Sequence, residues 1–127
     1  MALKISLKPS EKMIINGAVV TNGSARSNLI IENRVSILRE KDIMKEADTP
    51  CSRIYLVIQL MYIDEGNAVE YHNTYWELVR DVVAAAPSTL KLIDTISDHI
   101  LQTNYYQALK MTRKLIAYEK ELLEHVK

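Results

Sequence analysis

The 127-residue sequence has little of several residue types, and each shortage excludes a class of protein. A single cysteine, Cys51, permits no internal disulfide, which fits a reducing cytoplasm. The three histidines, His72, His99 and His125, are far apart and lack the spacing of metal ligands with Cys or Glu. All three glycines lie in expected turns, so the chain has no glycine-rich phosphate loop. We therefore expect a protein that is not an enzyme, with no catalytic residue, no metal and no cofactor.

Long apolar runs are also missing. The most apolar run, Ile54–Ile63, contains Gln59 and is far shorter than the ~20 residues that a membrane helix needs. Near the N-terminus, Lys4 and Lys8 interrupt the place where the apolar core of a signal peptide would lie. We expect a soluble cytoplasmic protein that has no membrane partner.

Because the chain has no phenylalanine, tyrosine and Trp76 must supply the aromatic packing in the core. Trp76 directly follows a tyrosine on a predicted helix, and Tyr106 directly follows Tyr105, so one ring of each pair points away from the face on which the other packs. We therefore take Trp76 and Tyr106 as candidate partner-binding residues. The tyrosines expected in the core are Tyr55, Tyr62, Tyr75 and Tyr118.

The N-terminal third contains short apolar runs, rich in Ile and Val, that are separated by turn dipeptides. Asn-Gly occurs twice there and supplies positive φ at two successive residues, as a type I′ hairpin requires. We predict an antiparallel β unit of four or five strands. The runs are Leu3–Leu7, Met13–Ile15, Ala18–Thr21, Leu29–Ile31 and Val35–Leu38, and the breaks are Pro9-Ser10, Asn16-Gly17, Asn22-Gly23 and Asn33-Arg34.

The rest of the chain has the apolar spacing of helices. Thr49 is a capping residue and Pro50 suits a first helical turn, while Pro87 ends one helix and Ser88 can cap the next. Short connections favour antiparallel neighbours, so we predict a bundle of about four helices after the strands. The fold class is α+β, with a β-rich unit over 1–45 and a helical bundle over 46–127. The predicted helices are a short one over Glu40–Ala47, then Pro50–Asp64, Glu70–Ala86, Ser88–Gln102 and one from Thr103 or Asn104 to the C-terminus.

Cys51 lies in the first turn of the helix that begins at Pro50, where the helix dipole can lower the pKa of a thiol. A nucleophile would need a histidine partner, and none is close in sequence. A small packed cysteine is the favoured interpretation.

The net charge of zero hides an asymmetry. Residues 1–45 carry eight basic and four acidic side chains, a net charge of +4, and the remainder carries −4. Lys4 and Lys8 are four residues apart and share a face of the first strand, while Arg39 ends the last strand beside Lys41. If these two strands become neighbours, the cations form one edge that can hold phosphates beside unpaired bases. We take Lys4, Lys8, Arg39 and Lys41 as candidate RNA-binding residues; the alternative is that these charges only solvate a small sheet.

Nearly the whole chain resembles the FlbT family of cytoplasmic regulators of flagellin synthesis. The resemblance lies in MALKISLKPSEKMIINGAVVTNG (Met1–Gly23), LIIENRVSILREKDIM (Leu29–Met44), ADTPCSRIYLVIQLMY (Ala47–Tyr62) and YYQALKMTRKLIAYEKELL (Tyr105–Leu123). It implies binding to the 5′ untranslated region of flagellin mRNA, coupled to mRNA decay or translational control. It also implies a role in flagellum biogenesis alongside the companion protein FlaF. Ser10 departs from the glycine expected after the proline.

A shorter stretch resembles the carbon storage regulator CsrA. VSILRE (Val35–Glu40) is similar to its last strand, and KPSEKMII (Lys8–Ile15) is similar to its first hairpin. In that family, basic residues of the first strand meet an arginine of the last strand across a dimer and hold a GGA loop. The resemblance thus implies RNA contacts by Lys8 and Arg39, with Lys4 beside them.

Two questions stay open at the level of sequence. The small β unit makes a homodimer attractive, but the helices could instead cover its apolar face within one chain. The acidic helical half could also bind a partner helix in a groove, which would make the protein an adaptor or chaperone in flagellar assembly.

Overall fold

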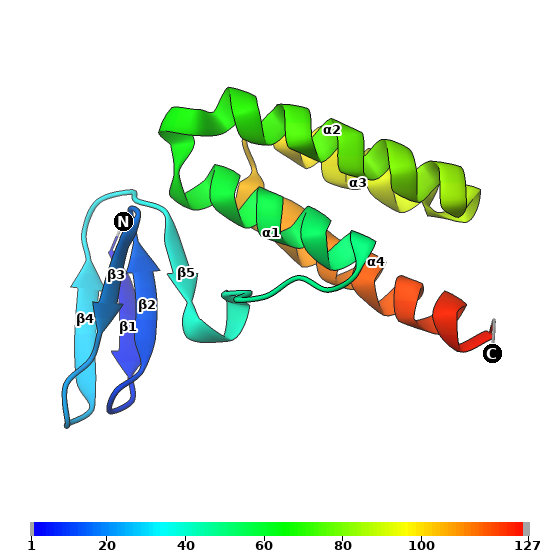
Figure 1. The fold of residues 1–127 in the computed structure, drawn as a ribbon. Coiled ribbons are helices and arrows are strands. Elements are labelled where there is room, and N and C mark those ends of the chain that lie inside the picture. Colours follow the sequence, from blue (N-terminus) through cyan, green and yellow to red (C-terminus); the bar gives the residue numbers. More distant parts are fainter. Residues whose placement is uncertain (1, 126–127) are drawn as a thin grey trace. The chain divides into compact units, whose positions relative to one another are not determined.

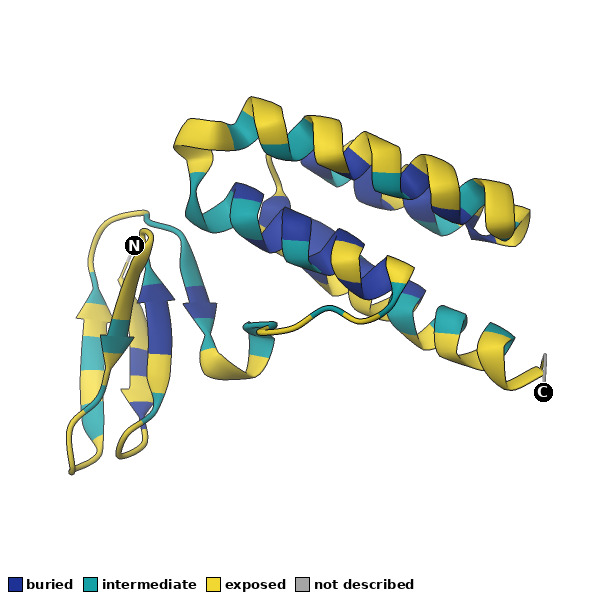
Figure 2. Cartoon of the chain, viewed as in Figure 1, coloured by how far each residue is buried: buried dark blue, intermediate teal, exposed yellow. Residues whose placement is uncertain are grey.

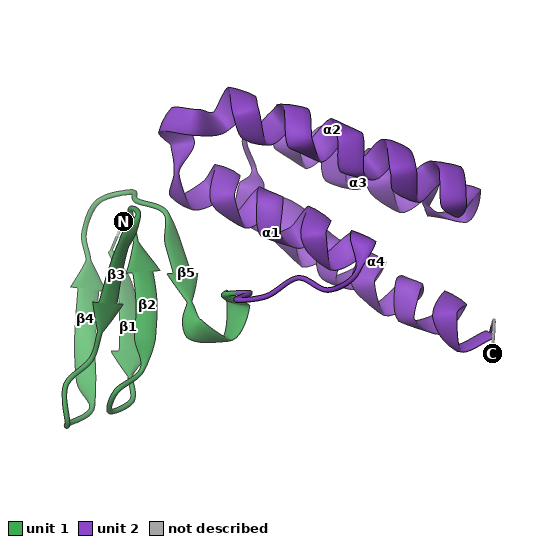
Figure 3. Ribbon diagram, viewed as in Figure 1, with its two compact units in different colours: residues 1–43 green, residues 44–127 purple. Residues whose placement is uncertain are grey.

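The computed structural model describes residues 2–125, which form a β unit followed by a helical unit (Figure 1). The chain divides into residues 1–43 and residues 44–127 (Figure 3). Strands precede helices throughout, so the α+β class predicted from the sequence is confirmed.

The β unit contains two small antiparallel sheets. In one, β1 pairs with β4; in the other, β2 lies between β3 and β5. The first and last strands therefore belong to different sheets, and the pairing on which the predicted cationic edge depended does not form. The strands are β1 (Leu3–Leu7), β2 (Lys12–Ile15), β3 (Ala18–Thr21), β4 (Ser27–Ile31) and β5 (Ile37–Arg39).

Strand alternation builds the core of this unit. Ile5 and Leu7 of β1 are buried together with Met13 of β2, while Lys4 and Ser6 lie on the opposite, exposed face of β1 (Figure 2). Half-buried side chains from both sheets complete the cluster: Ile15, Leu29, Ile31 and Ile37.

The two Asn-Gly dipeptides behave differently. Asn16 and Gly17 have φ of 49° and 85° and join the paired residues Ile15 and Ala18, which confirms the predicted hairpin turn. The prediction for Asn22-Gly23 is wrong, because neither residue has positive φ. Instead, the side-chain amide of Asn22 donates to the main-chain oxygens of Leu7, Lys8 and Ala25, at 3.2, 2.8 and 2.9 Å.

Four helices form the second unit, in which α4 packs against α1 and α3, and α1 also packs against α2. The predicted helix over Glu40–Ala47 is wrong beyond its first turn, since only the 3₁₀ turn η1 (Glu40–Asp42) forms. The predicted end of the last helix at 126–127 lies outside the described residues. The elements are α1 (Pro50–Ile63), η2 (Glu65–Asn67), α2 (Ala68–Ala85), η3 (Pro87–Thr89), α3 (Leu90–Leu101) and α4 (Tyr105–His125).

The helical core uses the tyrosines that the chain has in place of phenylalanine. Tyr55 and Tyr75 are buried, as predicted, whereas Tyr62 and Tyr118 are only half-buried. Tyr75 Oη lies 2.7 Å from Ser97 Oγ, and burial raises the pKa of Tyr75 to about 12, although this hydrogen bond opposes the shift. The aromatic core is therefore hydrogen-bonded internally as well as packed.

Polar side chains fix how the helical unit begins. Thr49 caps α1 through Ser52, as predicted, with both bonds of a capping box present. The predicted cap Ser88 lies instead within η3, where its hydroxyl accepts from Tyr118 Oη at 2.6 Å. Gln59 is buried in α1 because its amide exchanges two hydrogen bonds with the main chain of Met44, at 2.8 and 3.0 Å.

None of the helices in residues 2–125 has the length and hydropathy that crossing a bilayer requires.

Candidate RNA-binding surface

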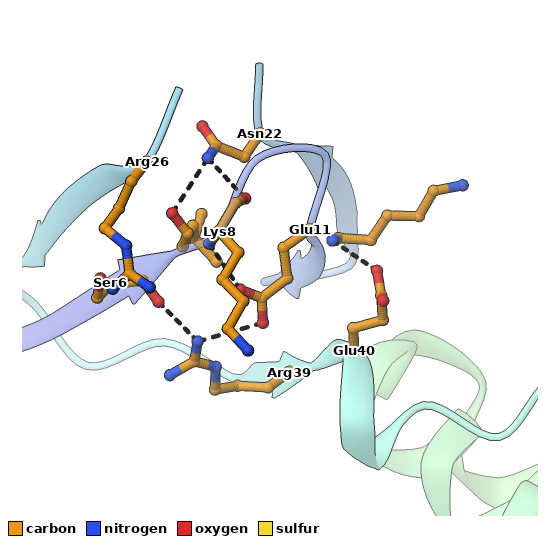
Figure 4. Close-up of polar contacts among 9 residues, drawn as sticks. Ser6, Lys8, Glu11, Asn22, Arg26, Arg39 and Glu40 are labelled. Carbon is orange, nitrogen blue, oxygen red and sulfur yellow. Dashed lines mark hydrogen bonds and ion pairs between the residues drawn. The ribbon is translucent and has the colours of Figure 1, made fainter. Parts of the chain in front are cut away.

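Two arginines reach Ser6, a residue on the exposed face of β1. Arg39 Nη2 donates to the main-chain oxygen of Ser6 at 2.8 Å, and Arg26 Nη1 donates to its hydroxyl oxygen at 3.0 Å (Figure 4). Arg39 ends β5, and Arg26 immediately precedes β4. Side chains from two separate parts of the unit therefore place two guanidinium groups beside one strand.

Glu11 holds Arg39 in this position. Their ion pair spans 3.3 Å between Nη2 and Oε2, with 36% of the Arg39 side chain and 19% of the Glu11 side chain exposed. The other Glu11 oxygen accepts the main-chain N–H of Lys8 at 2.9 Å. This N–H is the main cause of a lowered Glu11 pKa; burial opposes it, and Arg39 adds to the lowering. The carboxylate thus stays ionised at neutral pH and orients the guanidinium.

The turn that carries Glu11 is tight. The N–H of Glu11 donates to the oxygen of Lys8 at 3.1 Å, with Pro9 and Ser10 as the central residues. Ser10 has φ of 64°, a value that a type II turn requires at this position and that glycine adopts most readily. Ser10 N–H also donates to the oxygen of Gly23 at 3.0 Å. The turn is thereby fixed to the loop that follows β3.

Lys8 and Lys41 line one hollow of about 360 Å³, together with the carboxylates Glu11 and Glu40. Like Glu11, Glu40 accepts a main-chain hydrogen bond, from Lys12 N–H at 2.7 Å. Both carboxylates therefore accept hydrogen bonds within the unit, and their two negative charges balance those of the two lysines in this hollow.

The four predicted RNA-binding residues fall into two connected groups. Lys4 and Ser6 lie on the exposed face of β1, Lys8 directly follows this strand, and Arg39 reaches the strand at Ser6. Lys41 joins the set through the hollow that it shares with Lys8. The meeting of a first-strand surface with the last-strand arginine, which the CsrA resemblance places across a dimer, occurs here within one chain.

Arg26 was missed by the sequence reasoning. It precedes β4, and only the pairing of β1 with β4, which sets Leu7 opposite Ser27, brings it beside Ser6. Its spacing from the other cations gives no sign of this. If the strand order had been known, the position of Arg26 next to a strand that pairs with β1 would have indicated this contact.

The two candidate partner-binding residues lie on separate surfaces of the helical unit. Trp76 is 40% exposed, packs edge-to-face on Tyr75, and borders a groove of about 610 Å³ between α2 and α3. Tyr106 is 37% exposed on α4, with Lys110 Nζ 5.0 Å from its ring centre. Both rings are available to a partner, but no contact among the described residues joins them.

Cys51 is a packed residue, as the favoured interpretation held. It is buried at the start of α1, where its N–H donates to Glu119 Oε2 at 3.0 Å. Burial, and after it the charge of Glu119, raises the pKa of the thiol to about 12. The thiol is therefore protonated at neutral pH. In the described part of the chain, no three His, Cys, Asp or Glu side chains form a group that could hold a metal ion.

Known proteins match this chain over nearly its whole length. Residues 3–123 match the family described as Flagellar protein FlbT. A Bradyrhizobium diazoefficiens protein named Probable flagellum biosynthesis repressor protein FlbT 1 is 47% identical over 125 residues, covering 96% of this chain and 85% of the relative. A Caulobacter vibrioides protein named Flagellum biosynthesis repressor protein FlbT is 42% identical over 130 residues, covering 99% of this chain and 92% of the relative. No solved structure matches the chain, so a CsrA-like arrangement stays a prediction.

Proposed function

The chain belongs to the FlbT family, and we propose that it is a non-enzymatic repressor of flagellum biosynthesis that binds the 5′ untranslated region of flagellin mRNA. The relatives named as flagellum biosynthesis repressors support the regulatory role. The observation that carries the RNA-binding role is the convergence of Arg26 and Arg39 on Ser6 of β1, a strand that also carries the exposed Lys4 and that Lys8 directly follows.

The chemistry of this surface suits a single-stranded segment. Lysine and arginine neutralise phosphates without reading sequence, and the guanidinium of Arg39, held by Glu11, keeps a fixed direction. An unpaired RNA loop can place its phosphates along one short strand, whereas a duplex presents its phosphates on a wider helical surface. We propose that Lys4, Lys8, Arg26 and Arg39 contact the RNA backbone and that Lys41 extends the contact through its hollow.

Repression in this proposal follows from occupation of the message. We propose no catalytic residue, so decay of the mRNA would be indirect, through exposure of the message or recruitment of a nuclease. Occupying the leader would also control translation. Both routes place the protein in the cytoplasm, with the flagellin mRNA leader as its main partner.

The second candidate function is that of an adaptor in flagellar assembly, which the exposure of Trp76 beside a groove favours. Such a role would bring a protein partner, for example FlaF, to the helical unit, and a homodimer could present two β units to one message. It differs from the first function in which half of the chain it uses.

The proposed function is tested by titrating labelled flagellin leader RNA at two or more salt concentrations. We compare the intact chain with Lys4→Ala/Lys8→Ala and with the control Lys91→Ala, which removes one exposed lysine of α3 outside the proposed surface. Removing two phosphate contacts lowers the magnitude of the log affinity against log salt slope by about 1.4 to 2, since each contact contributes about 0.7 to 1. A fully paired duplex of the same sequence competes poorly.

Two outcomes would contradict the proposal. One is an unchanged affinity and salt slope in the Lys4→Ala/Lys8→Ala variant, which would remove the β1 surface from the RNA site. The other is an equal loss in Lys91→Ala, which would mean that RNA binds by overall charge alone.

A further inference from the structure

An apolar groove lies at one end of the helical unit, where the first turn of α1, the last turns of α2 and the last turns of α4 meet. Its volume is about 690 Å³. Val82 and Ala85 of α2 face Leu122 and Leu123 of α4 across it, and Cys51 lies at the α1 side. Leu123 is 55% exposed. Apolar side chains of this size in a groove between helices are typical of sites that take the apolar face of another helix.

The rim of the groove is acidic. Asp81 of α2 and Glu119 of α4 line it. Glu119 and Leu123 also line a second hollow of about 470 Å³. Three more carboxylates and one lysine line this hollow: Glu46, Asp48, Glu124 and Lys120. The helical half as a whole carries the negative part of the charge asymmetry, with 12 acidic against eight basic side chains in residues 46–127.

These two features together select the occupant. An anionic ligand is disfavoured, because the N-terminus of α1 already bonds to Thr49 and Glu119 and the rim repels negative charge. A helix with apolar residues on one face and Lys or Arg along its edges fits both the walls and the rim. We propose that this groove docks a basic amphipathic helix of a partner protein. The site uses none of the cations proposed to contact RNA, so it would bring a second protein to an RNA-bound chain.

The probe for this proposal is a synthetic amphipathic helix made of Leu and Lys, measured by fluorescence anisotropy with the full chain. Two control peptides accompany it: one of the same composition in scrambled order, and one with Glu in place of Lys. The scrambled peptide keeps the charge and loses the apolar face, while the Glu peptide keeps the face and reverses the charge. The expected result is that the Leu/Lys helix binds at least about tenfold more tightly than either control.

Two pairs of variants locate the binding. Asp81→Lys reverses a charge on the rim, and Glu77→Lys makes the same change one helical turn earlier on the same face of α2 but outside the groove lining. Leu123→Ser removes an apolar wall, and Leu101→Ser removes a leucine at the end of α3 that is also more than half exposed. Asp81→Lys and Leu123→Ser each weaken binding about tenfold, whereas both control variants stay within about twofold of the intact chain.

Three results would overturn the proposal. The Leu/Lys helix and the scrambled peptide could bind equally, which would indicate attraction by charge alone. The groove and control variants could also lose affinity equally. Finally, the chain could self-associate without peptide in a manner that Leu123→Ser abolishes, which would assign the groove to a second copy of the chain.

Discussion

Arg39 Nη2 lies 2.8 Å from the main-chain oxygen of Ser6, although the strands that carry these two residues belong to different sheets. The same guanidinium pairs with Glu11. Because no strand pairing connects β1 with β5, this side chain ties the two sheets together at the surface. Arg39 therefore has a structural role in addition to the proposed RNA contact. Experiments on this residue must distinguish a loss of stability from a loss of RNA affinity.

Arg39→Ala should loosen the β unit as well as weaken RNA binding. The variant leaves the Ser6 oxygen without its charged donor, and we expect the free energy of local opening to fall by about 1 kcal/mol, discounted for exposure. Hydrogen exchange of β1 and β5 amides measures this change. Lys8→Ala is the matched control, because it removes a cation but none of the hydrogen bonds that Arg39 makes between the sheets, so its amide protection should stay unchanged while RNA affinity falls. Unchanged protection in Arg39→Ala would show that the Ser6 contact does not hold the sheets.

Ser10→Gly should stabilise the β unit. Ser10 has φ of 64°, where a side chain costs about 1 kcal/mol, and glycine removes this cost while losing part of the gain as chain entropy. The expected net effect is about 0.5 kcal/mol of added stability, read from urea unfolding or from exchange of the β2 amides. The control is Ser24→Gly, an exposed loop serine without positive φ, which should lose about 0.5 kcal/mol. Equal losses in both variants would show that the turn at Ser10 is not strained.

Local sequence patterns predicted the individual strands and helices, but they did not predict which strands pair to form the two sheets. All five strands overlap the predicted apolar runs. The strands and the α1 cap follow from features within a few residues, such as alternating apolar positions or Thr49 before Pro50. The pairing of β1 with β4 joins residues that are 20 to 28 positions apart, and no side-chain pattern in either strand specifies it. The cationic surface depends on that pairing, so Arg26 could not be assigned from the sequence.

Competing side-chain chemistry explains the local errors. Asn22 has the same dipeptide context as Asn16, but its amide finds three main-chain oxygens in the adjoining segments, which favours a loop over a tight hairpin. Ser88 was expected to cap a helix because it follows proline, yet it accepts a hydrogen bond from Tyr118, thirty residues away. Both outcomes depend on partners that are distant in sequence.

Thr49→Ala should destabilise the helical unit by about 1 kcal/mol. The Thr49 hydroxyl accepts the Ser52 N–H at 3.1 Å, and Ser52 returns a bond to the Thr49 N–H. Urea unfolding followed by helical circular dichroism measures the loss. Thr95→Ala is the control, since this exposed threonine of α3 bonds only to a carbonyl one turn back, and it should change stability by less than about 0.5 kcal/mol. A Thr49→Ala variant as stable as the control would remove the capping box from the forces that fix α1.

Cys51 should resist alkylation in the folded chain. Its pKa is raised to about 12 from an ordinary value of 9.0, and the difference of 3 units lowers the thiolate fraction at pH 8 by about a thousandfold. Iodoacetamide should therefore modify the native protein at least that much more slowly than the urea-unfolded chain.

The same shift in the Cys51 pKa predicts that the stability of the fold decreases as pH rises from 9 toward 12, because the unfolded thiol loses its proton there and the folded thiol keeps it. Cys51→Ala should flatten this fall, apart from a contribution of Tyr75 above pH 10, where the pKa of that phenol is likewise raised. Rapid alkylation of the native chain at pH 8 would place the thiol at an accessible surface and reopen its interpretation as a nucleophile.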